Sequence, residues 1–149
     1  MEINVEDNFT LLFDKNNNTA YKALQALQKE CEKSDRVYCY MDKLADMIDS
    51  DNSYIRTRGL TLIAYNAKWD KDNKIDEIID EYLKHIEDVK PITARQCIKL
   101  LPMIAKNKPE LKCDIVFALQ KADISIYADS MQSLVCKDIQ NSLAEIENL

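Results

Sequence analysis

The chain has 149 residues, of which 46% are hydrophobic and 31% are charged, and its formal net charge is −6. This length suits one domain with a substantial core, and the acidic balance counts against a protein that binds phosphate backbones through clustered Lys and Arg. A single Gly and three Pro leave few positions for tight turns, so the composition favours helices over a β-sandwich or barrel.

The N-terminal residues are acidic and polar rather than typical of a targeting segment. Residues 1–7 lack the basic region and apolar core of a signal peptide. The longest apolar runs, such as residues 60–65, fall far short of the roughly 20 residues of a membrane span. We therefore expect a cytoplasmic protein with no membrane partner, whose residues up to Asp14 form a short cap.

Four segments repeat a pattern of small and large apolar residues at helical spacing. A small residue recurs at intervals of 36, 38 and 33 positions: Ala23, Gly59, Cys97 and Ser130. Large apolar residues occur one and four positions later: Leu24, Leu60, Ile98, Met131, and Leu27, Ile63, Leu101, Leu134. Because a small side chain lets a neighbouring helix approach closely, we expect the small column to lie at helix contacts.

A second helix is predicted after each of the first three. Its apolar columns are Val37, Ile75, Leu111; Met41, Ile79, Ile115; Leu44, Tyr82, Ala118; and Ile48, Ile86, Ala122. Ser34 or Asp35, then Asp72, are the expected N-caps of the first two, and Pro109 suits the first turn of the third. Pro91 likewise suits the start of the helix around Cys97. Residues 125–146 read as one long helix or a bent pair, with apolar residues Met131, Leu134, Val135, Ile139, Leu143 and Ile146.

The segment from Ile48 to Leu60 resembles the boundary between two HEAT repeats. It has an apolar helix end, a short acidic turn, an apolar residue followed by Arg56, and the small Gly59 three positions later. Residues 12–14 and 86–88 are weaker copies, and Pro102 falls where such helices are often kinked. The resemblance to the HEAT/armadillo-like helical repeat family implies an all-α fold. We expect an α-α superhelix (HEAT-like solenoid) of three helix pairs plus a terminal helical unit.

The resemblance also sets expectations for the domain and its repeats. Residues 1–149 would form a single HEAT-like domain with approximate repeats at 12–50, 51–88, 89–123 and 124–149. Only one boundary carries both Asp and Arg, so we expect no continuous Asp–Arg ladder. Small bacterial HEAT-like proteins of unknown role are also similar, some labelled SufBD for iron–sulfur assembly. The SufB and SufD scaffolds are largely β-helical, and this chain has no such strands, so we do not transfer that function.

No catalytic, cofactor-binding or metal site is expected. His85 is the single histidine, and a solvated surface position is favoured over a metal site with Glu81 and Asp88. Catalysis by a Ser–His or Cys–His pair would have to use this same residue. The cysteines are odd in number, lack C-x-x-C spacing and are expected to be free thiols: Cys31, Cys39, Cys97, Cys113 and Cys136.

The family resemblance implies a non-enzymatic protein-interaction scaffold. One alternative is a nucleic-acid-interacting or DNA-repair-related HEAT-like protein. Trp69-Asp70 resembles the aromatic residues and catalytic Asp of HEAT-like DNA glycosylases only superficially, because it lies in a loop. Another is a small subunit of a homo- or hetero-oligomer. Trp69 is expected to close its loop over the core edge, whereas Tyr38, Tyr54 and Tyr65 are expected to be exposed.

The second helices of the repeats offer the expected binding surface. The buried stripe of residues 75–86 leaves Glu77, Asp80, Glu81 and Lys84 facing outward, and Asp42, Lys43 and Asp46 hold equivalent positions one repeat earlier. We name the set Asp42, Asp46, Glu77, Asp80, Glu81 and Lys84 the acidic ridge. In HEAT-like stacks these helices usually line the concave face, so the ridge is expected to meet a basic segment of a protein partner. A simple solvated face is the alternative.

The third of these helices differs, because its outward positions are mainly apolar. They are Cys113, Val116, Phe117 and Gln120. We expect the C-terminal helix to cover them through Val135, Ile139 or Leu143, with cover by a partner as the alternative.

Overall fold

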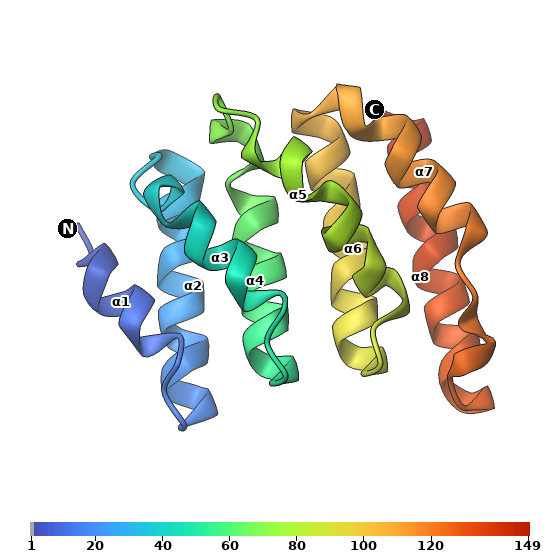
Figure 1. The fold of residues 1–149 in the computed structure, drawn as a ribbon, viewed down its shortest axis with the longest axis horizontal. Coiled ribbons are helices and arrows are strands. Elements are labelled where there is room, and N and C mark those ends of the chain that lie inside the picture. Colours follow the sequence, from blue (N-terminus) through green and yellow to red (C-terminus); the bar gives the residue numbers. More distant parts are fainter. Residues whose placement is uncertain (1) are drawn as a thin grey trace.

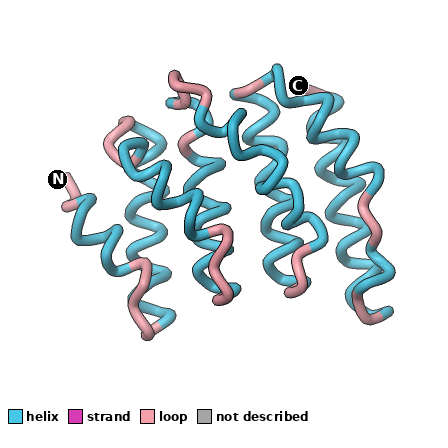
Figure 2. Tube along the Cα trace, viewed as in Figure 1, coloured by secondary structure: helices cyan, strands magenta, loops and turns pink. Residues whose placement is uncertain are grey.

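The computed structural model describes residues 2–149, and its helices form two layers (Figure 1). The B layer contains α1 (Val5–Leu11), α3 (Met41–Met47), α5 (Lys74–Leu83) and α7 (Lys112–Lys121). The A layer contains α2 (Asn17–Lys33), α4 (Ser53–Tyr65), α6 (Pro91–Asn107) and α8 (Asp129–Glu147). Figure 2 shows helices joined by loops, and residues 2–149 contain no strand. The predicted all-α superhelix is confirmed.

Short 3₁₀ helices complete the connections between the layers. They are η1 (Tyr38–Tyr40), η2 (Ala67–Trp69), η3 (Lys84–Glu87), η4 (Pro109–Leu111) and η5 (Ile124–Ile126). The B-layer helices α1, α3 and α7 each pack against the A-layer helix that follows, whereas η3, which continues α5, packs against α6. Neighbouring A-layer helices pack against one another. α4 therefore lies between α2 and α6, and most of its residues are buried.

Side-chain caps set where several helices begin. Asn16 and Asn52 accept backbone hydrogen bonds from the first turns of α2 and α4, and Pro91 occupies the first turn of α6 as predicted. The predicted cap Asp72 is wrong: the Asp70 carboxylate accepts from the amides of Lys74 and Ile75, which open α5, at 2.9 Å each.

Two further predicted starts are displaced by 3₁₀ turns. Ser34 accepts a hydrogen bond from the Arg36 amide at 3.3 Å, but α3 begins only at Met41, after η1. Pro109 opens η4, and α7 follows from Lys112. The sequence does not distinguish such a 3₁₀ turn from the first turn of an α-helix, because the side chains of the two repeat with nearly the same period.

The small column confirms close packing at three of its four positions. Ala23 and Cys97 are buried, and a Cβ built on Gly59 would lie 2.9 Å from Met47 Cβ and 3.1 Å from the Leu44 carbonyl oxygen. α4 therefore approaches α3 closely at Gly59.

The fourth position of the small column is wrong. Ser130 is exposed in the first turn of α8, and Leu134 is 40% exposed. The buried residue is Val135, which lies 38 positions after Cys97, the same interval that separates Gly59 from Cys97. The 33-residue interval had aligned α8 out of register.

Contrary to the prediction, the C-terminal helix α8 does not cover all the apolar outward positions of α7. Phe117 is 62% exposed and Cys113 is exposed, although Val116 is half-buried against the core. α8 packs on α7 where Ile115 and Leu119 are buried, and this contact leaves the Phe117 side facing solvent.

Polar bonds between residues 32 to 39 positions apart link one repeat to the next. Trp69 Nε1 donates to the Cys31 carbonyl at 2.6 Å, which places the indole over the core edge as expected. Tyr38 is buried, contrary to expectation, because its hydroxyl donates to Asp70 at 2.6 Å. Lys108 Nζ reaches the same carboxylate at 3.2 Å. Arg–Asp pairs occur at two later steps, Arg56–Asp88 at 2.7 Å and Arg95–Asp138 at 2.6 Å, whereas the links above use other residue types. Within residues 2–149 the Asp–Arg pairing is therefore not continuous along the stack.

Candidate functional site, a groove along helix α4

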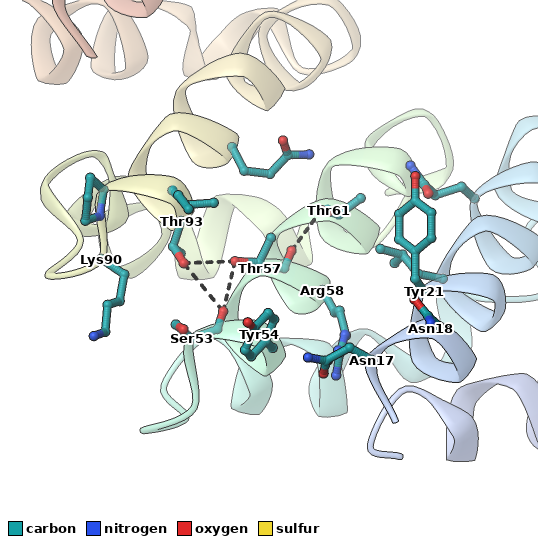
Figure 3. Close-up of a pocket in the computed structure, with 15 residues that line it drawn as sticks. Asn17, Asn18, Tyr21, Ser53, Tyr54, Thr57, Arg58, Thr61, Lys90 and Thr93 are labelled. Carbon is teal, nitrogen blue, oxygen red and sulfur yellow. Dashed lines mark hydrogen bonds between the residues drawn. The ribbon is translucent and has the colours of Figure 1, made fainter. Parts of the chain in front are cut away.

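A groove of about 840 Å³ opens on the outer face of the A layer (Figure 3). Its floor is α4 and its walls are α2 and the start of α6. The lining consists of amide, hydroxyl, aromatic and aliphatic side chains with two cations: Asn17, Asn18, Tyr21, Leu24, Gln28, Ser53, Tyr54, Thr57, Arg58, Thr61, Lys90, Pro91, Ile92, Thr93 and Gln96.

The groove exists because the outward positions of α4 carry short side chains. Thr57 and Thr61 donate back to their own helix, to the carbonyls of Ser53 at 2.9 Å and Thr57 at 2.8 Å. The Thr57 and Thr93 hydroxyls also lie 2.9 Å apart, which joins the floor to α6 (Figure 3). Helix α4 is also shorter than its neighbours, with 13 residues against 17 in α2 and α6.

Large side chains on the walls remain open to solvent. Tyr21 on α2 is 56% exposed, Tyr54 on α4 is 58% exposed, and Ile92 on α6 is 75% exposed. Three such side chains around one concave surface provide the apolar contacts that a bound segment needs, because rigid aromatic groups contribute large contact areas.

Arg58 is the cation at the base of the groove. Its Nη1 donates to the Leu12 carbonyl at 2.8 Å and its Nη2 to Asn17 Oδ1 at 3.3 Å. The guanidinium carbon lies 5.7 Å from the centre of the Tyr54 ring. Only 7% of the residue is exposed, and this burial lowers the pKa of the guanidinium from its ordinary value.

A second hollow, of about 530 Å³, lies one helical turn further along the same helices. On α4 its lining moves from Thr61 to Tyr65, and on α6 from Gln96 to Lys99 and Met103. Glu32, Lys68, Lys106 and Glu145 also line it. The two hollows together follow α4, whose 13 residues span about 20 Å at 1.5 Å per residue.

The acidic ridge lies on the opposite layer, on α3, α5 and η3. All six of its side chains are exposed. Three of its charges are already paired, since Lys74 Nζ lies 2.9 Å from Asp42 and the ridge's own Lys84 Nζ lies 2.9 Å from Glu81. The ridge is therefore less negative than its sequence indicates, and the 840 Å³ groove lies on the A layer rather than the B layer.

His85 is not the solvated histidine that the sequence suggested. Its side chain is largely buried, and Nδ1 lies 2.7 Å from Asp88 Oδ2. Asp88 also receives two hydrogen bonds from Arg56, so His85 belongs to a structural network. Residues 2–149 contain no group of three or more His, Cys, Asp or Glu arranged to hold a metal ion.

The remaining predicted residues are distributed as single features. The five cysteines are free, with Cys31 and Cys97 buried and Cys39 and Cys113 exposed. Tyr54 is exposed as expected and Tyr65 is half-buried. Asp70, which the DNA-repair alternative singled out, is buried and fully occupied by Tyr38, Lys108 and the α5 amides.

Sequence reasoning missed the groove because it treated the A-layer helices only as core. The available signal was the spacing of non-core residues on each helix. Asn17, Tyr21, Leu24 and Gln28 on α2 follow a three- or four-residue interval, as do Tyr54, Thr57 and Thr61 on α4.

Comparison with known protein families agrees with this architecture. The HEAT repeat domain family matches residues 2–142. The chain belongs to the HEAT repeat domain family. No curated protein and no solved structure matches this HEAT repeat domain. None of its helices within residues 2–149 is long and apolar enough to cross a membrane. HEAT repeats typically mediate protein–protein interactions, so the exposed faces of the two layers are the candidate binding surfaces.

Proposed function

We propose that this HEAT repeat domain is a non-enzymatic protein-interaction scaffold that binds a segment of a partner protein along α4. The observation that carries the proposal is the concave surface in which Tyr21, Tyr54 and Ile92 stay exposed. Exposed aromatic and aliphatic side chains in a hollow are the usual anchors of binding energy. The described lining residues of the groove include no histidine, cysteine or carboxylate.

The acidic ridge is our proposal for a second contact surface, for a basic segment of a partner. Its support is the exposure of all six side chains across two neighbouring repeats. Two of its acidic side chains already pair with lysines, so we place the main contact in the groove. Association through the ridge would chiefly be faster at low salt.

Selection from a random peptide display library against the whole chain tests the proposal. The selected peptides are then mapped by changes in backbone amide NMR signals. We expect the changes to cluster on α2, α4 and the start of α6, and we expect Tyr21→Ser with Ile92→Ser to abolish binding. Phe117→Ser is the matched control, because Phe117 is equally exposed but lies on α7. Peptides that map only to the B layer would show that the groove is not the binding surface.

A further inference from the structure

We propose that the groove binds an acidic segment of its partner, and that one carboxylate of this segment pairs with the Arg58 guanidinium. This inference rests on the proposed function and names the partner chemistry of the same groove.

Arg58 lacks the counter-ion that the other buried cations have. Arg56, Arg58 and Lys108 are the buried cations within residues 2–149. Arg56 pairs with Asp88 at 2.7 Å, and Lys108 pairs with three carboxylates at 2.7 to 3.2 Å. Over the same residues Arg58 has no carboxylate within salt-bridge distance, only the neutral oxygens of Leu12 and Asn17. A buried charge without a partner is costly, so a carboxylate that reaches it gains more than one at the surface.

The lining of the groove has the opposite charge balance to the protein. The chain carries a net charge of −6, yet Arg58 and Lys90 are the charged residues among the described residues that line the groove. Lys90 is exposed at the open end beside α6 (Figure 3). A locally positive groove attracts an acidic segment.

The environment of Arg58 orients it for a carboxylate. The Tyr54 ring lies against the guanidinium, and Leu12 and Asn17 each take a single N–H, which leaves donors of the planar group for a ligand. A carboxylate can accept two parallel hydrogen bonds from such a group. Tyr21 and Ile92 lie along the same groove and suit apolar side chains that flank the acidic residue. The segment would therefore combine acidic and apolar residues.

A protein segment fits these charges better than a nucleic acid. A phosphate backbone requires a row of cations that neutralises successive phosphates. Along α4 the cations are interrupted, because Glu32 and Glu145 line the second hollow beside Lys68 and Lys99. A single acidic side chain needs only the recessed Arg58.

The peptides selected from the random library test this inference directly. We expect them to be enriched in Asp and Glu next to apolar residues, and to lose binding when Asp and Glu are replaced by Asn and Gln. Arg58→Gln is expected to weaken binding about 30-fold or more, the effect of removing one partner of a buried hydrogen-bonded charge pair. Arg58→Lys keeps the charge without the planar donors and should give an intermediate loss. Lys137→Gln on the exposed side of α8 is the matched control and should bind like the parent.

A readout on the unmodified protein guards against a folding defect in the Arg58 variants. The Nε–H signal of Arg58 should shift with an acidic peptide and not with its Asn/Gln counterpart. Groove-bound peptides that are basic or uncharged would overturn the acidic partner while leaving the groove as the binding surface. Failure to select any groove-binding peptide would overturn both proposals. Displacement of the peptide by single-stranded oligothymidylate at the same amides would overturn the acidic segment in favour of a nucleic acid.

Discussion

The Arg56 guanidinium holds the Asp88 carboxylate through hydrogen bonds of 2.9 Å from Nε and 2.7 Å from Nη2. The same carboxylate accepts from the Lys90 amide at 2.9 Å and faces His85 Nδ1 at 2.7 Å. The Asp88 carbonyl accepts from the Tyr127 hydroxyl at 2.6 Å. One residue in the turn before α6 therefore joins α4, η3, α6 and the segment that leads into α8. This turn also places Lys90 at the open end of the groove.

Replacing Asp88 by Asn should strongly destabilise the fold. The change keeps the shape but leaves Arg56 buried without its counter-ion, and breaking one partner of a buried ion pair costs about 3–5 kcal/mol. Urea denaturation followed by circular dichroism measures this loss. Asp46→Asn is the control, since Asp46 is exposed and its side chain makes no hydrogen bond or ion pair with residues 2–149. Equal stability of the two variants would show that Asp88 does not hold the turn.

Acid should destabilise the protein through Asp88 and Asp70. Burial alone would raise the pKa of Asp88, but hydrogen bonds from His85, Arg56 and the Lys90 amide outweigh it and hold the pKa well below its usual range. Burial likewise opposes the bonds from Tyr38, Lys108 and the α5 amides that lower the pKa of Asp70. A group with a depressed folded-state pKa stabilises the fold above its unfolded pKa, and this contribution is lost as the pH falls below about 4.

The pH dependence of the free energy of unfolding measures this effect. It should decline steeply as the pH falls below about 4, where the unfolded chain takes up protons that the native carboxylates do not. The Asp88→Asn variant should show a shallower decline, because one of the carboxyls with a lowered folded-state pKa is gone. An identical slope in parent and variant would show that Asp88 titrates normally in the native state.

Gly59 should tolerate no side chain. Gly59→Ala should destabilise the fold, because the added Cβ would lie 2.9 Å from Met47 Cβ. The helix gains about 1 kcal/mol from Ala, but overpacking costs about 1–3 kcal/mol, so we expect a net loss near 1 kcal/mol. Gly59→Leu should lose about 3 kcal/mol. Thermal melts distinguish these values, and a Gly59→Ala variant that melts above the parent would contradict the close approach of α4 to α3.

The two helical layers could be predicted because buried apolar residues recur with the period of a helix, and this spacing is visible in the sequence. The columns that begin at Val37 and Met41 are buried in or just before α3, α5 and α7, as are Leu24, Leu60 and Ile98 in the A layer. The predicted register of the fourth A-layer helix, α8, was wrong because Ser130 matched the small column by residue type alone. Size does not fix register when a helix is longer and its preceding turn differs.

The groove and the buried polar links were beyond the sequence for a different reason. Asp70 and Asp72 are equally good caps in sequence. In the structure the backbone is left-handed at Asn73, just before α5, and the first amides of α5 donate to Asp70. Arg58 is indistinguishable from Arg56 in sequence, yet Arg56 meets Asp88 and Arg58 meets neutral oxygens. Such pairings depend on contacts between residues of different repeats that lie 32 to 46 positions apart in the sequence.

Phe117 should contribute to association rather than to folding. Its ring is 62% exposed and carries the Lys121 ammonium 5.2 Å from its centre. Phe117→Ser should therefore change the free energy of unfolding by no more than about 0.5 kcal/mol. If the chain forms an oligomer through this face, the same variant should lower its mass in sedimentation experiments. A strongly destabilised Phe117→Ser variant would show that α8 covers the ring in solution.

Charge reversal of the acidic ridge separates the two proposed surfaces. Asp46, Glu77 and Asp80 are exposed on α3 and α5, so changing all three to Lys should leave the thermal melt nearly unchanged. Binding of the groove-directed peptides should persist, because the ridge lies on the other layer. A basic partner of the ridge should associate more slowly with the variant, and the difference should shrink as salt screens the charges. Polylysine peptide is a direct probe, with the exposed lysine change Lys137→Gln as the control. Unchanged polylysine association at low salt, in a normally folded triple variant, would remove the ridge as a binding surface and leave the groove alone to carry the interaction.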